Sequence, residues 1–224
     1  MKNEKDLFDY DSLAFFGRVN ASISHELKNI MAIISETAGL LTDLSEMAST
    51  GTPVDPDMLK NSAGSIIEEI QRAFKTIRQM NRFSHSVDAP IVSVDLVELL
   101  DLICQLANYL SFCGKIRLTP WDGDPPEVQT CPFALQAIVY EIVVQHFKNE
   151  GPSAELDIDV QPLSNTGWVI GIADPGSHGL QDFTDNRIEK AATSIGVAIK
   201  GEGGHLKLNV PLTIQTGLAK SEAG

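Results

Sequence analysis

The chain has 224 residues, of which 43% are hydrophobic, so it can form one large domain or two small ones around a packed core. Its formal net charge of -13, from 17 basic and 30 acidic residues, would repel nucleic-acid phosphates and anionic lipid, and no Lys/Arg-rich run offsets this charge locally. The acidic start, MKNEKDLFDYD, contains no secretory signal and no obvious linker, and no apolar run is long enough to span a bilayer. We therefore expect a complete, soluble and cytosolic protein that binds neither nucleic acid nor membrane.

An apolar heptad pattern predicts a long first helix. From Ile23 to Ala48 the apolar residues recur in alternating steps of four and three, and only Thr37 interrupts the pattern. The segment STGTPVDP (49–56) contains one glycine and two prolines, which end the helix, and Asp57 is expected to cap the next one.

The heptad pattern resumes in a second predicted helix, from Leu59 to Met80. Two helices joined by a short loop form an antiparallel hairpin. Ile67 and Phe74 make the apolar stripe wider than a single partner helix could cover. A second copy of the hairpin would cover it, so we expect a homodimeric four-helix bundle. The alternative is that the stripe packs on the C-terminal half of the chain.

The second half has a different pattern, which predicts a sheet covered by helices, beginning near Ile91. Together with the hairpin this gives an α+β fold. The expected elements are a helix over 94–110, a strand over 115–120, a buried apolar helix over 131–147, a β-hairpin over 154–176, and a short helix, glycine-rich turn and last strand within 192–215.

The three cysteines, Cys104, Cys113 and Cys131, each lie in an apolar neighbourhood. An odd number without C-x-x-C spacing favours buried thiols over a disulfide framework or a zinc site.

The first helix carries a polar stripe. Ser22, His25, Glu26 and Asn29 follow i, i+3, i+4, i+7 spacing, so we expect them to share one outward face. An imidazole that attacks a phosphoryl group needs its second nitrogen held, and an adjacent carboxylate can orient the ring and accept its proton. Asn29 could hydrogen-bond a phosphoryl oxygen or position a water. The plainer alternative is an ordinary solvated helix face.

The segment FGRVNASISHELKNIMAII (16–34) resembles the H-box of bacterial two-component histidine kinases, in which a dimeric helical hairpin carries the phosphorylated histidine near the start of its first helix. The resemblance implies that His25 is the phosphoacceptor, Glu26 its acid/base partner, and Asn29 a residue of phosphatase or transfer chemistry. Ile30 stands where the family commonly has a kinking proline, so a straighter helix is expected. His85 is not directly followed by a carboxylate and is predicted to be surface. The matching residues are Phe16, Ser24, His25, Glu26, Leu27, Lys28 and Asn29.

By order and spacing the second half resembles the ATP-binding domain that follows this hairpin in histidine kinases. The resemblance implies a dimerisation and phosphotransfer hairpin over 1–88 and a kinase-type domain over 89–224. That family's ATP site uses an asparagine-bearing helix for Mg²⁺, an aspartate in a glycine turn for adenine, and a second glycine turn for the phosphates.

Most of these nucleotide-site features are altered in this chain. Glu141 and Gln145 stand where asparagine is expected, and the longer glutamine misplaces its oxygen for a small octahedral ion. The second glycine turn and its lid are short and offer no basic cluster for a triphosphate. The segment 201–214 is expected to be too short for a closing pair of strands. The first turn, DPGSHG, matches only in Asp174, Gly176 and Gly179, and the second retains only Gly196.

Three functions remain possible. A histidine phosphotransferase would pass a phosphoryl group between response-regulator receiver domains through His25, with Mg²⁺ supplied by the receiver and no ATP or other cofactor of its own. This function fits the residues best. An orphan histidine kinase would use Glu141, Gln145 and Asp174 in an atypical site. A non-catalytic scaffold would only dock receivers.

Overall fold

The computed structural model describes residues 10–110, 112–164, 166–176, 180, 186–202 and 204–214. They form two compact units. One is the helical segment Arg18–Arg82, and the other combines the described residues up to Gly17 with those from Phe83 onward.

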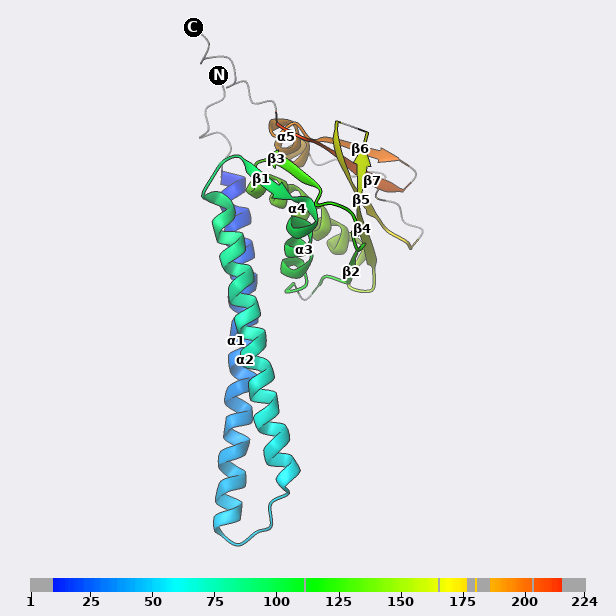
Figure 1. Ribbon diagram of the computed structural model, residues 1–224. Helices are drawn as coiled ribbons and strands as arrows, with labels where there is room; N and C mark the ends of the chain where they lie inside the picture. Colours follow the sequence, from blue (N-terminus) through cyan, green and yellow to red (C-terminus); the bar gives the residue numbers. More distant parts are fainter. Residues whose placement is uncertain are drawn as a thin grey trace. The chain divides into compact units, whose positions relative to one another are not determined.

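The helical hairpin consists of α1 (Tyr10–Ser49) and α2 (Pro56–Ser84), which run side by side and antiparallel (Figure 1). α1 is unbroken past Ile30, as expected without the proline. The predicted cap of α2 is wrong by two residues: the backbone N–H of Asp57 donates to Asp55 Oδ1 at 2.9 Å, so Asp55 is the cap. The reason is that Pro56 fits the first helical position, where a proline needs no backbone N–H and its fixed φ suits the helix.

The two predicted apolar stripes differ in burial within the hairpin. On α1 the stripe residues Ile23, Ile30 and Leu44 are buried. On α2 much of the stripe is exposed, and Ile67 and Phe74 keep 56% and 59% of their surface accessible. The buried residues of α2 include Ser62, Thr76 and Gln79, so its buried face is more polar than the heptad pattern predicts.

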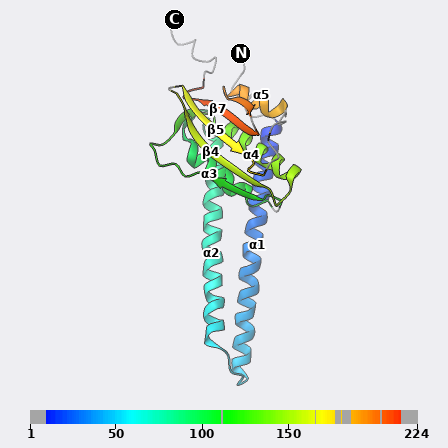
Figure 2. The ribbon, with the colours of Figure 1, turned by 90° about the vertical axis from the view of Figure 1, so that its right-hand side faces the viewer.

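The second unit is α+β, as predicted. A five-stranded sheet has the order β2-β4-β5-β7-β6, and β1 pairs antiparallel with β3 in a separate small sheet. Figure 2 shows β4, β5 and β7 side by side. The elements in chain order are η2 (His85–Val87), β1 (Val92–Asp95), α3 (Leu96–Ala107), β2 (Lys115–Leu118), β3 (Glu127–Thr130), α4 (Pro132–Glu150), β4 (Glu155–Leu163), β5 (Gly167–Ala173), α5 (Asn186–Ser194), β6 (Ala198–Glu202) and β7 (His205–Pro211).

Burial follows the sequence pattern in this unit. α4 is apolar on nearly every side and is buried over most of its length, with Pro132 at its start. Along β4 the buried residues Leu156, Ile158 and Val160 alternate with half-exposed acidic ones, which is the period of a sheet with one covered face.

Three strands depart from the expectations. β1 and β3 were not predicted, because each has only four residues. The segment 201–214 was expected to be too short for a closing pair of strands, yet a pair forms, because β6 begins at Ala198, before that segment. β6 and β7 pair antiparallel from Ala198↔Asn209 to Glu202↔His205. A tight turn makes the pair possible, since Gly204 adopts a φ of 83° that a side chain would disfavour.

An aromatic cluster anchors the helix ends within the second unit. The ring of Phe15 lies 5.4 Å from Phe83, 5.2 Å from Phe133 and 5.3 Å from Tyr140, measured between centroids, and Phe16 stacks on Phe83. Such pairs add to the hydrophobic gain of burying large rings.

The three cysteines form no disulfide. Cys104 and Cys131 are buried, as predicted, while Cys113 is only half-buried. Burial raises the pKa of Cys104 to about 12 and that of Cys113 to about 11. Within the described part of the chain, no helix is both long and apolar enough to cross a membrane.

Candidate functional site

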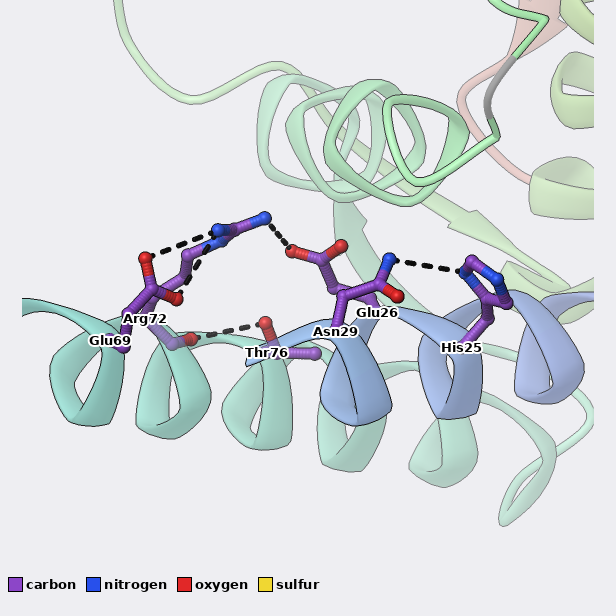
Figure 3. A network of polar contacts seen from close by, with 6 residues as sticks. All are labelled: His25, Glu26, Asn29, Glu69, Arg72 and Thr76. Carbon is purple, nitrogen blue, oxygen red and sulfur yellow. Dashed lines mark hydrogen bonds and ion pairs between the residues drawn. The ribbon is translucent and has the colours of Figure 1, made fainter. Parts of the chain in front are cut away.

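His25 lies on α1 with its side chain exposed, and one helical turn later Asn29 is exposed as well. The amide nitrogen of Asn29 is 3.3 Å from His25 Nδ1 (Figure 3). The i, i+4 spacing brings the two side chains together. The contact engages Nδ1 and leaves Nε2 as the ring nitrogen turned away from Asn29.

Glu26 does not share the outward face that the spacing predicts. It is 9% exposed, and its Oε1 lies 2.5 Å from Nη2 of Arg72 on α2. The reason is that consecutive helix residues point about 100° apart, so Glu26 turns toward the neighbouring helix while His25 faces outward. Ser22, the fourth member of the stripe, is half-buried.

Arg72 was not singled out by the sequence pattern, which gave no signal that it would reach the first helix. Its Nη1 also lies 3.3 Å from Oε2 of Glu69, one turn earlier on α2 (Figure 3). Partial burial opposes the charge of Arg72, but the hydrogen bonds and charges of Glu26 and Glu69 outweigh it and raise the pKa of the guanidinium. Arg72 therefore stays charged and holds two carboxylates.

His85 is exposed, as predicted, and no carboxylate follows it directly, but a carboxylate does contact its ring. Its Nδ1 lies 2.6 Å from Asp88 Oδ2. Asp88 is three residues later, a spacing that brings side chains together on a helical turn.

The positions where the kinase resemblance places a nucleotide lie in the second unit. Glu141 and Gln145 are half-buried on α4. Asp174 follows β5 and accepts a hydrogen bond from the Gly176 N–H at 2.6 Å. Gly196 has a φ of 70° in the turn after α5, and Gly179 lies outside the described residues.

A buried histidine, His146 on α4, lies beside Asp174 and was not predicted as a site residue. The two side chains are 3% and 5% exposed, and His146 Nε2 is 3.7 Å from Asp174 Oδ2. Among the residues that the structure describes, none gives this nitrogen a hydrogen bond. Burial lowers the pKa of His146, although Asp174, Glu150 and a hydrogen bond to the backbone of Glu155 favour the charged form. The imidazole is therefore neutral at neutral pH. A histidine inside the apolar run of α4 was the available signal.

The described residues contain no group of three or more His, Cys, Asp or Glu side chains that could hold a metal ion.

The chain matches no protein-family model and no curated protein. It is similar to solved structures of histidine kinases. The ATP-binding domain of PrrB from Mycobacterium tuberculosis is 19% identical over 55% of this chain and 98% of that one, with a TM-score of 0.45. The histidine kinase ThkA, in complex with the response regulator TrrA, is 16% identical over 90% of this chain and 63% of that one, with a TM-score of 0.41. The cytoplasmic segment of the histidine kinase QseC is 16% identical over 71% and 97%, with a TM-score of 0.40.

Proposed function

We propose that this protein is a histidine phosphotransferase of a two-component phosphorelay, which passes a phosphoryl group between receiver-domain aspartates through His25. The observation that carries the proposal is an exposed imidazole whose Nδ1 is engaged by Asn29, beside the carboxylate of Glu26. An imidazole held at one nitrogen and open at the other suits attack on a group that another protein brings.

The transfer follows from the ring's geometry. For Nε2 to attack, its lone pair must be unprotonated, so the ring proton must sit on Nδ1. The amide nitrogen of Asn29 faces Nδ1 in the structure, so this tautomer requires the Asn29 amide to turn over and accept the Nδ1–H hydrogen bond through its oxygen. The lone pair forms a P–N bond while the bond from phosphorus to the aspartyl oxygen breaks, and its electron pair returns to the carboxylate. The Mg²⁺ of the receiver would stabilise the transferring group, and Glu26, paired with Arg72, would serve as the acid/base partner that the resemblance implies. The reverse steps deliver the group to a second receiver.

We propose that the second unit supports docking rather than ATP chemistry. Glu141 and Gln145 replace the expected asparagines, and Asp174 is already occupied by the Gly176 N–H and faces buried His146. The chain would then need no nucleotide or metal of its own.

We further propose that the chain acts as a homodimer. The exposed apolar residues of α2 form a stripe, comprising Leu59, Ile67, Ile70, Phe74 and Ile77. Contiguous exposed apolar surface of this kind marks an interface in soluble proteins. A second copy of the hairpin would bury it in a four-helix bundle.

An orphan histidine kinase is the second candidate. It is favoured by the β6–β7 pair, which gives the five-stranded sheet an edge strand that the sequence did not predict. A receiver-docking scaffold without chemistry is the third. Both the kinase and the scaffold would use the same hairpin and the same receiver domains.

Transfer from a phosphorylated receiver tests the proposal. A panel of isolated receiver domains is labelled with radioactive acetyl phosphate, freed of it, and mixed with the protein. We expect label on the wild type and on His85→Gln, no label on His25→Gln, and slow labelling of Glu26→Ala. Labelling of His25→Gln would contradict the proposal. Label that reaches His25 from radioactive ATP instead would favour the kinase.

A further inference from the structure

The residue that follows His25 carries a carboxylate, although the group that His25 would accept is an anion. Glu26 is the next residue, and Glu69 belongs to the same side-chain network (Figure 3). The whole chain carries a formal net charge of -13. A phosphoryl group brings about two further negative charges, and like charges at close range repel, most strongly where burial excludes water.

We propose that Arg72 is a positioning residue that makes this site acceptable to a phosphoryl group, by neutralising and fixing the carboxylate of Glu26. The inference rests on the proposed function only in taking His25 as the phosphoryl acceptor.

The geometry supports a role through Glu26. Arg72 Nη2 is 2.5 Å from Glu26 Oε1, and the contact joins α2 to α1 across 46 positions of sequence. Only 11% of the Glu26 side chain is exposed, so water can screen its charge poorly, whereas Arg72 is 47% exposed and can keep part of its charge in solvent. The planar guanidinium also contacts Glu69 through its other terminal nitrogen, which fixes its orientation.

Two small reagents separate charge from nucleophilicity at His25. Phosphoramidate is an anionic phosphoryl donor: the ring nitrogen's lone pair forms a P–N bond, the donor's own P–N bond breaks, and ammonia leaves with that electron pair and a proton. The ring proton passes to solvent. Diethyl pyrocarbonate is neutral and acylates the same imidazole. Repulsion by an uncompensated carboxylate would slow only the anionic reagent.

The experiment measures both rates at His25, by mass spectrometry of the peptide that contains it, in the full-length protein. For Arg72→Gln we expect phosphoramidate labelling to fall about tenfold or more, while acylation changes by less than about twofold. Arg72→Lys should lose less phosphoramidate labelling than Arg72→Gln, because lysine keeps the positive charge but lacks the planar guanidinium. Lys28→Gln is the matched control, since it removes an exposed positive charge one turn from His25, and we expect it to lose no more than about twofold.

A double-mutant cycle tests whether Arg72 acts through Glu26. In a Glu26→Gln background there is no carboxylate to neutralise, so adding Arg72→Gln should cost little. The same tenfold loss in that background would show that Arg72 acts directly on the donor and would overturn the inference. So would an equal loss with both reagents, an equal loss in Lys28→Gln, or no loss at all. Circular dichroism confirms that each variant keeps its helices. Because no receiver takes part, a failed relay and a failed inference give different results.

Discussion

At His25 the surroundings of the imidazole differ from those that a linear reading predicts. The histidine and the carboxylate are neighbours in sequence, yet the ring contacts Asn29 four residues later and Glu26 contacts Arg72 on the other helix. The i, i+4 contact could be predicted from helix periodicity alone. The ion pair could not, because it depends on how the two helices are rotated against each other.

His146 leads to a prediction about stability and pH. Its folded-state pKa is lowered by burial, so the unfolded chain, with an ordinary value near 6.5, binds the proton first as pH falls. The free energy of unfolding is therefore unaffected by His146 above about pH 6.5. Below that pH it decreases, by at most about 1.4 kcal/mol per pH unit. Asp174 and Glu150 face the ring and reduce the effect. Urea unfolding of the wild type and of His146→Gln between pH 7 and 5 should show a flatter profile for the variant.

The exposed His205 provides the control for this measurement, because His205→Gln removes an imidazole from the same unit. Its profile should follow that of the wild type. A steep profile that persists in His146→Gln would assign the pH dependence to other groups.

At the scale of elements, the heptad pattern of α2 predicted an apolar stripe but not the direction in which it faces. Within one chain the buried side of α2 includes Thr76, whose hydroxyl donates to the Arg72 carbonyl at 3.1 Å, and Gln79. The apolar residues lie largely on the solvent side. A periodic pattern specifies a face, and the neighbours of that face are decided by packing.

This orientation predicts how the dimer should respond to charge. Phe74→Glu places a carboxylate in the centre of the proposed interface, where burying an unpaired charge is costly, so we expect the dimer to dissociate. Light scattering after size exclusion measures the mass of each species. Lys75→Glu changes the next, exposed position of the same helix and should leave the dimer intact. A wild type that is monomeric at micromolar concentration would rule out the proposed dimer.

At the scale of the whole molecule, the chain combines a helical hairpin that carries the exposed His25 with an α+β unit. Glu141 and Gln145 are half-buried on α4, a helix that is buried over most of its length, and this is where the nucleotide chemistry is proposed to be lost. Core packing constrains apolar volume, whereas ligand sites depend on a few polar residues that can change without unfolding the chain.

Calorimetric titration of the full protein with Mg-ATP tests this loss. We expect no binding into the millimolar range, because Glu141 and Gln145 stand where asparagines are expected. The same titration of His146→Ala, which removes the ring beside the Asp174 carboxylate, shows whether that ring contributes to the absence of binding. Micromolar binding by the wild type, equivalent to about -8 kcal/mol, would establish a working nucleotide site and favour the kinase.

The sequence by itself determined the α+β class, the hairpin, and the candidate residues His25, Glu26 and Asn29, because helix and strand periodicity and a short motif are local properties of the chain. The tertiary structure decided that Glu26 pairs with Arg72 and that His146 lies against Asp174. It also decided that β6 pairs with β7 at the edge of the sheet. These contacts join residues far apart in the chain or depend on a single tight turn. Their formation depends on the packing of whole elements, which no local pattern encodes.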